Sequence, residues 1–203
     1  MGGNIYIDSV WSAGYKAQSA TATLLTQNIS GKSGKRIAIK AFGYSAANVS
    51  TVLYFMQALG QTTLASAAAS GGTTIVLTAK TIGGSATAAI GDIATGDYVA
   101  VVLADGTYQF TTVASMQTSL TVTLAAALTD DGTSGNAVYG LGVASDQGHL
   151  QYKLTVSTQN TKELDGGIFY GNAKSYPMMI YFLSAGATAL TSLDYLTVDY
   201  VNK

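Results

Sequence analysis

Two β-prone runs joined by an Asp-Gly pair constrain this chain more than any other stretch of its sequence. They lie on either side of Asp105-Gly106, at residues 96–104 and 107–113. Asp-Gly between such runs is the strongest short-range signal for a tight hairpin with a type I′ turn. The sequence therefore predicts an antiparallel hairpin whose register is set by this turn.

Two more β-prone runs flank this hairpin. Residues 120–124 alternate apolar side chains with threonine, which predicts Leu120, Val122 and Leu124 on one face. The run at 74–78 can supply a fourth strand.

Glycine-rich stretches bound this region on both sides. They lie at residues 60–72 and 139–145, and an Ala-rich helical turn fits residues 64–69 within the first. We therefore expect residues 61–145 to form a small β domain.

The rest of the chain predicts a second β unit, the body, made of residues 1–60 and 146–203. Its β-prone runs lie at residues 5–10, 20–26, 36–42, 51–56, 149–156, 166–170, 178–183 and 195–201. Residues 51–56 show little polar alternation, which places that strand centrally. It should pair with 149–156 as a hairpin whose loop has expanded into the inserted domain. Eight strands fit an all-β, jelly-roll-like sandwich of two sheets.

Charged residues are scarce and unevenly placed. They make up 10% of the chain, against roughly 25% in an average soluble domain. Residues 61–145 hold five Asp and one Lys, whereas the flanking parts hold nine basic and six acidic residues. The body is thus the side expected to meet an acidic partner. A net charge of −1 with a single Arg argues against nucleic acid as a partner.

No pattern in the sequence indicates a catalytic residue, a metal site or a cofactor. The chain has no Cys, and His149 is its single histidine. Glu163 and Asp165 fit a turn better than a glycosidase pair, and residues 130–136 lack the carboxylate pattern of a calcium loop. We expect a protein that is not an enzyme.

The densest basic cluster is the loop that ends at Arg36. Its Gly-Lys-Ser triplet resembles part of a phosphate-binding loop, but Thr26 stands where that motif requires glycine. Two interpretations remain: a solvated hairpin turn, or a partner-contact patch made of Lys32, Lys35 and Arg36.

Thirteen tyrosines are an excess for a chain of this length. Several lie near predicted loops, namely Tyr15, Tyr44, Tyr170, Tyr176 and Tyr195. Tyrosine combines a large apolar area with a polar hydroxyl, so it suits oligomer interfaces and sugar-binding platforms. Pairing between neighbouring strands is an equally good interpretation.

Two stretches were considered as a targeting signal or a membrane span, and neither fits. Residues 1–6 lack the basic and apolar regions of a secretory signal, which predicts synthesis in a cytoplasm. Residues 176–193 are uncharged but contain Pro177 and Gly186, so we expect a buried strand and a loop there, with no membrane partner.

The Thr- and Gly-rich strands, the absence of cysteine and the runs at 74–77, 93–99 and 120–124 resemble β domains of tailed-bacteriophage virion proteins. The whole chain is most similar to a head decoration, or cement, protein. The resemblance implies a structural protein on the capsid surface, made in the host cytoplasm, that binds the major capsid protein and assembles as a dimer or trimer. An alternative is a receptor- or carbohydrate-binding module of a phage fibre or adhesin, with a glycan as its partner.

Overall fold

The computed structural model contains two compact units. The body comprises Met1–Gln57 and Leu150–Lys203, and the second unit, the insert, comprises Ala58–His149. The structure describes residues 10–11, 15–18, 23–29, 31–46, 52–58, 60–79, 93–118, 120–142, 150–155, 159–163, 169–170, 176–183 and 190–202. These residues form strands and loops without any helix, so the described chain is all-β, as expected.

One sheet of the body is built around its two longest described strands. These are β4 (Lys35–Ala46) and β16 (Leu190–Asn202), which pair antiparallel. Strands β1 and β2 pair with β16, and β13 and β14 pair with β4. Their bounds are Val10–Trp11, Tyr15–Gln18, Gln159–Glu163 and Phe169–Tyr170, respectively.

The second sheet of the body has the order β12-β5-β15-β3, and all its pairs are antiparallel. The bounds in that order are Leu150–Thr155, Val52–Gln57, Met178–Leu183 and Thr23–Ile29. Strand β5 lies between two neighbours, which confirms the prediction of a central strand at 51–56. The predicted pairing across the insertion is also confirmed, because Met56 lies opposite Leu150.

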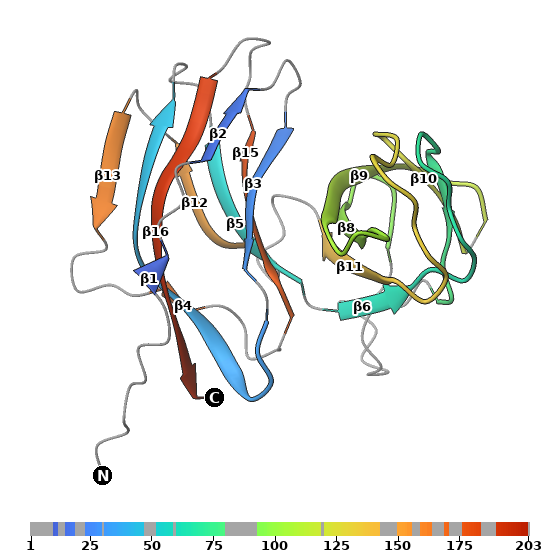
Figure 1. Cartoon of the computed structure of the whole chain (residues 1–203), viewed down its shortest axis with the longest axis horizontal. Helices are drawn as coiled ribbons and strands as arrows, with labels where there is room; N and C mark the ends of the chain where they lie inside the picture. The colour runs from blue at the N-terminus through green and yellow to red at the C-terminus, as the bar shows by residue number, and fades with distance from the viewer. Residues whose placement is uncertain are drawn as a thin grey trace. The chain divides into compact units, whose positions relative to one another are not determined.

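The two sheets face each other across one hydrophobic core, which makes the body a β-sandwich (Figure 1). Phe42 on β4 and Phe55 on β5 meet between the sheets, with ring centroids 4.9 Å apart. Both sheets contribute to the buried cluster, which consists of Ile29, Ile37, Ile39, Phe42, Leu53, Phe55, Met178, Ile180, Val198 and Tyr200. Interdigitation of inward-facing side chains is what holds two such sheets together.

A β-bulge on β4 sets which of its side chains enter this core. Thr197 on β16 pairs with Ala41 and Val198 pairs with Ile39, so Lys40 is the extra residue of the bulge. An extra residue shifts the alternation of side chains by one position. Ile39 and Phe42 can therefore both be buried, although strict alternation would place them on opposite faces.

Some predictions for the body are wrong. The sequence predicts no strand between residues 10 and 20, but Trp11 belongs to β1 and β2 begins at Tyr15. Strand β13 was not expected at all, because its sequence is polar throughout. Of the strand expected at 5–10, only Val10 lies within the described residues. Such short or polar strands depend on pairing with a neighbour rather than on an apolar pattern.

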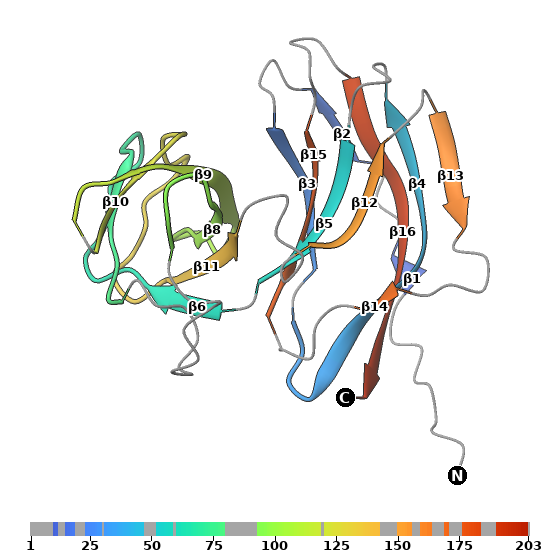
Figure 2. The same ribbon diagram turned by 180° about the vertical axis from the view of Figure 1, so that it is seen from behind.

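Six strands of the insert form one antiparallel sheet that closes on itself (Figures 1 and 2). Their order is β6-β11-β8-β9-β10-β7, with bounds Gly60–Thr63, Ala137–Gly142, Tyr98–Val102, Tyr108–Met116, Thr121–Leu124 and Thr74–Val76. A bridge between Leu64 and Leu77 joins the two outer strands. The amide of Thr78 donates to the Thr63 carbonyl oxygen beside it, at 2.9 Å. Closure leaves the insert without an exposed sheet edge.

Apolar side chains from the connecting loops and from every strand but β6 fill the interior of this closed sheet. They are Leu64, Ala68, Ile75, Leu77, Ile93, Val99, Val101, Leu103, Val113, Val122, Leu124, Leu128 and Val138. The four strands predicted for this region are thus present. The insert also contains β6 and β11, which the sequence analysis assigned to glycine-rich seams.

Two further local predictions for the insert are wrong. Residues 64–69 form no helical turn, because Leu64 and Ala68 are held in bridges to Leu77 and Gly132. Leu120 does not share a buried face with its predicted neighbours, since it lies just before β10 and is 37% exposed.

The hairpin around Asp105-Gly106 is confirmed, but its turn is not of type I′. That turn requires a positive φ at both central residues, whereas only Gly106 has one, at +82°. The Leu103 carbonyl oxygen accepts from the Gly106 amide at 3.0 Å, and the Thr107 carbonyl oxygen accepts from the Leu103 amide at 2.9 Å. These bonds define a three-residue loop, in which a type I turn is followed by a left-handed glycine.

Candidate functional site

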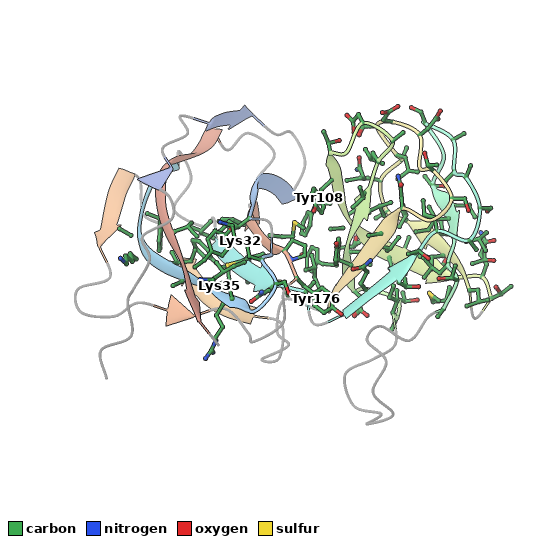
Figure 3. The ribbon with its side chains drawn as sticks, turned by 60° about the horizontal axis from the view of Figure 1, so that its bottom comes forward. Lys32, Lys35, Tyr108 and Tyr176 are labelled. Atoms are coloured by element: carbon green, nitrogen blue, oxygen red, sulfur yellow. The ribbon has the colours of Figure 1, made fainter. Side chains whose placement is uncertain are left out.

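The basic cluster predicted from the sequence lies at the turn between β3 and β4. The Lys35 amide donates to the Lys32 carbonyl oxygen at 3.2 Å, and Gly34 between them has a φ of +73°. A positive φ at the third position is the pattern of a type II turn. The two lysines thus lie at the two ends of one hydrogen-bonded turn, and β4 begins at the second of them. Both are labelled in Figure 3.

Lys32 is exposed but has a defined position. Its Nζ lies 4.1 Å from the centroid of the Tyr200 ring. Tyr200 belongs to the core cluster and is only 8% exposed. An ammonium over an aromatic face is attracted by the ring quadrupole, by about 0.5–1 kcal/mol at an exposed site. This contact ties the predicted patch to the end of the body core.

The basic patch extends along β4 beyond the three predicted residues. Arg36 and Lys40 are both partly exposed, whereas Ile37 and Ile39 between them belong to the core. Lys40 is the extra residue of the β-bulge, so regular alternation from Arg36 does not set its direction. The sequence analysis missed Lys40, because a bulge leaves no mark in the apolar pattern of a strand.

The basic patch is defined here as Lys32, Lys35, Arg36 and Lys40. Two acidic positions lie close to it in the register, because Asp199 on β16 pairs with Ala38 and Glu163 on β13 pairs with Ala41. The patch can form charge-assisted hydrogen bonds to carboxylates on a partner.

A second candidate surface lies on the outside of the closed sheet of the insert. Val99 and Val101 of β8 point into its interior, so the alternate residues of β8 face outward. The same alternation directs four aromatic side chains of three adjacent strands outward, namely Tyr98, Tyr108, Phe110 and Tyr139. Tyr108, Phe110 and Tyr139 are partly exposed, whereas Tyr98 is 8% exposed. We call these four side chains the aromatic face.

The rings of the aromatic face form two pairs. Tyr98 and Phe110 stack with centroids 5.2 Å apart and an interplanar angle of 11°. Tyr108 and Tyr139 lie 6.1 Å apart and are tilted by 31°. Partial burial raises the pKa of the Tyr108 hydroxyl above its ordinary value of 10.0. Tyr108 is labelled in Figure 3.

The tyrosines selected from the sequence lie elsewhere. Tyr15, Tyr44, Tyr170 and Tyr195 belong to strands of the body rather than to loops. Tyr176 precedes β15, and its carbonyl oxygen accepts from Gln57 Nε2 at 2.9 Å.

The oxygen-rich loop at residues 130–136 holds the end of the closed sheet together. Asp131 Oδ1 accepts from the Ser70 amide at 2.7 Å, and Asn136 Nδ2 donates to the Val102 carbonyl oxygen at 3.0 Å. These bonds fit the structural turn favoured by the sequence analysis.

No group of three or more His, Asp or Glu side chains that could hold a metal ion occurs in the described part of the chain. Of the other titratable residues considered, His149 and Asp165 lie outside the described residues, and Glu163 ends β13. The described residues contain no helix that is long and apolar enough to cross a membrane.

No protein-family model matches the sequence, and comparisons with curated proteins and with solved structures found no match.

Proposed function

We propose that this chain is a virion structural protein that binds the outer surface of an assembled phage capsid as an oligomer and reinforces it. In this role it is made in the host cytoplasm and ends on the capsid surface. It binds the major capsid protein and further copies of itself, and it performs no catalysis.

The observation that carries the proposal is the nested pairing of the body strands. Apart from the two-residue strands β1 and β14, each strand before the insert pairs with one after it, in reverse order along the chain. The pairs are β2 with β16, β3 with β15, β4 with β13, and β5 with β12. One long ribbon rolled onto itself has this pairing, so we assign the body to the jelly-roll class. Jelly rolls are frequent in viral capsid proteins.

Surface composition supports the same role. Charged residues make up 10% of the chain, so little like-charge repulsion opposes close contact with neighbouring subunits. A contact of roughly 800 Å² per partner is enough for specific association. Repetition of that contact around a lattice adds avidity that a single contact does not supply.

We propose that the basic patch contributes to the contact with the shell. Co-sedimentation with purified shells of the phage that encodes the chain tests this directly. We expect the wild type to sediment with the shells and to raise their melting temperature. A triple variant with Lys32, Lys35 and Arg36 changed to Glu should bind more weakly, and more salt should weaken the wild type as well.

The control variant for this experiment changes three positive residues elsewhere in the chain. Lys16 and Lys153 lie on β2 and β12, which do not pair with the part of β4 that carries the basic patch, and Lys80 belongs to the insert. Their combined change to Glu should leave binding close to that of the wild type. A wild-type chain that stays in the supernatant at every salt concentration refutes the proposed function.

The aromatic face favours a second candidate, a carbohydrate-binding module. Aromatic rings on adjacent strands can stack against sugar rings, while the tyrosine hydroxyls donate or accept hydrogen bonds. A glycan array should then give a reproducible hit, and Tyr108→Ala and Tyr139→Ala should each remove it. Tyr176→Ala, which changes a tyrosine of the body, serves as the matched control.

A further inference from the structure

We infer that Asp105 is a site at which this chain forms isoaspartate spontaneously, and that Thr107 slows the reaction. In isoaspartate, the side-chain carboxyl carbon replaces the main-chain carboxyl carbon in the peptide bond to the next residue. The inference concerns the covalent chemistry of the insert and is independent of the capsid role.

The reaction needs an aspartate whose carboxyl carbon can be reached by the amide nitrogen of the next residue. Glycine hinders this approach least, because it has no Cβ. Asp-Gly pairs occur at residues 105–106, 131–132 and 165–166. The first two pairs lie within the described residues, and the third lies outside them.

The chemistry at Asp105 consists of an attack by the Gly106 nitrogen on the side-chain carboxyl group. The carboxyl group is first protonated. A C–N bond then forms between the Gly106 nitrogen and Asp105 Cγ, a C–O bond at Cγ breaks, and the amide proton leaves with the hydroxyl group as water. A second water molecule opens the resulting succinimide ring at the main-chain carbonyl of Asp105, so that Gly106 stays attached through Cγ. The product is an isomer of the starting chain, and water is the one co-reactant.

The pair Asp131-Gly132 is held by residues that are distant in the sequence. Gly132 is buried; its amide donates to the Ala68 carbonyl oxygen at 2.7 Å, and the Ala68 amide donates back at 2.8 Å. A Cβ at Gly132 would lie 2.7 Å from Leu64 Cδ1, so this glycine has little room to move. Asp131 Oδ1 accepts from the Ser70 amide at 2.7 Å. The reaction at this pair therefore requires the bridge between the two loops to open.

The pair Asp105-Gly106 is held only within its own turn. Both residues are exposed, and no atom lies within 4 Å of a Cβ placed at Gly106. The Gly106 amide donates to the Leu103 carbonyl oxygen at 3.0 Å. An exposed turn opens at a lower free-energy cost than a buried bridge. Asp105 should therefore react before Asp131.

Thr107 holds the carboxylate of Asp105 away from this reaction. Its hydroxyl and its amide both donate to Asp105 Oδ1, at 2.7 and 2.8 Å. To react, the carboxyl group must leave these donors and accept a proton. Both bonds favour the ionised carboxylate, and they lower the pKa of Asp105. Loss of the hydroxyl should therefore speed the reaction.

The product would affect the aromatic face. Isoaspartate adds one backbone atom to the turn beside the pair formed by Val102 and Tyr108. The Tyr108 ring lies 6.1 Å from the Tyr139 ring. A longer turn should therefore loosen this end of the aromatic face.

Peptide mapping of the full chain after prolonged warm incubation at mildly acidic pH tests the site. Electron-transfer fragmentation distinguishes isoaspartate from aspartate in each peptide. We expect about fivefold more isoaspartate at residue 105 than at residue 131, because the two sites differ in the cost of local opening. An equal or greater amount at residue 131, or none at residue 105, overturns the assignment of the site.

Variants of the donor test the role of Thr107. Thr107→Val should form isoaspartate at residue 105 about threefold faster than the wild type, because one hydrogen bond to the carboxylate is lost. Thr107→Ser keeps a hydroxyl and should react at nearly the wild-type rate. Thr129→Val, which removes a hydroxyl that donates to Gln109, serves as the matched control. A Thr107→Val variant that keeps the wild-type circular dichroism spectrum and reacts no faster than the control overturns the protective role.

Discussion

Gly106 adopts the left-handed backbone conformation that the turn of the central hairpin of the insert requires. Its φ is +82°, and a Cβ placed there would meet no atom within 4 Å. A substitution at this position therefore acts through backbone strain and creates no clash.

We expect Gly106→Ala to lower the free energy of unfolding of the insert by roughly 1–2 kcal/mol, measured by urea denaturation. Gly106→Asn should cost less, because asparagine tolerates the left-handed region better than alanine. Equal losses for the two variants would show that strain at this φ is not the cause.

Asp105 is held in the same turn by its neighbour. Thr107 donates to Asp105 Oδ1 from its hydroxyl at 2.7 Å and from its amide at 2.8 Å. The hydroxyl bond, followed by the amide bond, lowers the pKa of Asp105 below its ordinary value of 3.8. Because the folded-state pKa is depressed, the carboxylate stabilises the fold above the unfolded pKa and loses this effect as the pH falls.

Thr107→Val removes the hydroxyl bond and keeps the amide bond. We expect the pKa of Asp105 to rise toward 3.8 in this variant, as measured by NMR titration of the carboxyl carbon. Thr129→Val removes a hydroxyl that donates to Gln109 instead, and it should leave the pKa of Asp105 unchanged. A shift of similar size in both variants would contradict the assignment.

At the level of the element, closure of the insert sheet depends on Leu64. This side chain is 1% exposed and belongs to the buried cluster, and its backbone bridges Leu77. Leu120 in the same unit is 37% exposed. The two leucines therefore differ in burial but not in chemistry.

We expect Leu64→Ala to destabilise the insert by about 2–5 kcal/mol, since it removes buried methyl groups and leaves a cavity. Leu120→Ala should change stability by no more than about 0.5 kcal/mol. Thermal or urea unfolding followed by circular dichroism compares the two. A larger loss of stability for Leu120→Ala than for Leu64→Ala would contradict the burial of Leu64 in the closed sheet.

Apolar strands were predictable from the sequence, and polar strands were not. The buried strands β5 and β15 have continuous apolar runs, which identified them within one residue. Strands β6 and β13 read Gly-Gln-Thr-Thr and Gln-Asn-Thr-Lys-Glu, which carry no periodic apolar signal. They are strands because a neighbour offers hydrogen bonds, and that neighbour is distant in the sequence.

For the whole molecule, the two ends of the insert leave the body at adjacent points. Met56 of β5 lies opposite Leu150 of β12. Within the insert, Gly60 of β6 lies opposite Gly140 of β11, near the points where the chain enters and leaves the closed sheet. Each unit also has its own buried cluster. Each should therefore fold without the other.

We expect two shortened proteins to fold. One contains residues 58–149 alone, and the other joins Gln57 to Leu150 by a short glycine-containing turn. Both should give β-type circular dichroism spectra and cooperative melting transitions. If either piece is unfolded while the full chain is folded, the units depend on each other for stability.

The candidate site was predictable in part. The cluster of Lys32, Lys35 and Arg36 followed from local sequence, whereas Lys40 joined it only once β4 was known to run from Lys35 to Ala46. The aromatic face was not predicted. Tyr98, Tyr108 and Phe110 lie on the two strands of the predicted hairpin, whereas Tyr139 comes from β11, which is distant in the sequence and pairs with β8 only in the folded chain.

The sequence by itself determined the all-β class, the hairpin at Asp105-Gly106 and the insertion between the strands at 51–56 and 149–156. These features depend on apolar periodicity and turn chemistry, which act between near neighbours in the chain. The tertiary structure alone decided the closure of the insert sheet by Leu64 and Leu77 and the β-bulge at Lys40 on β4. Those features depend on hydrogen bonds between distant strands, for which the local sequence carries no signal.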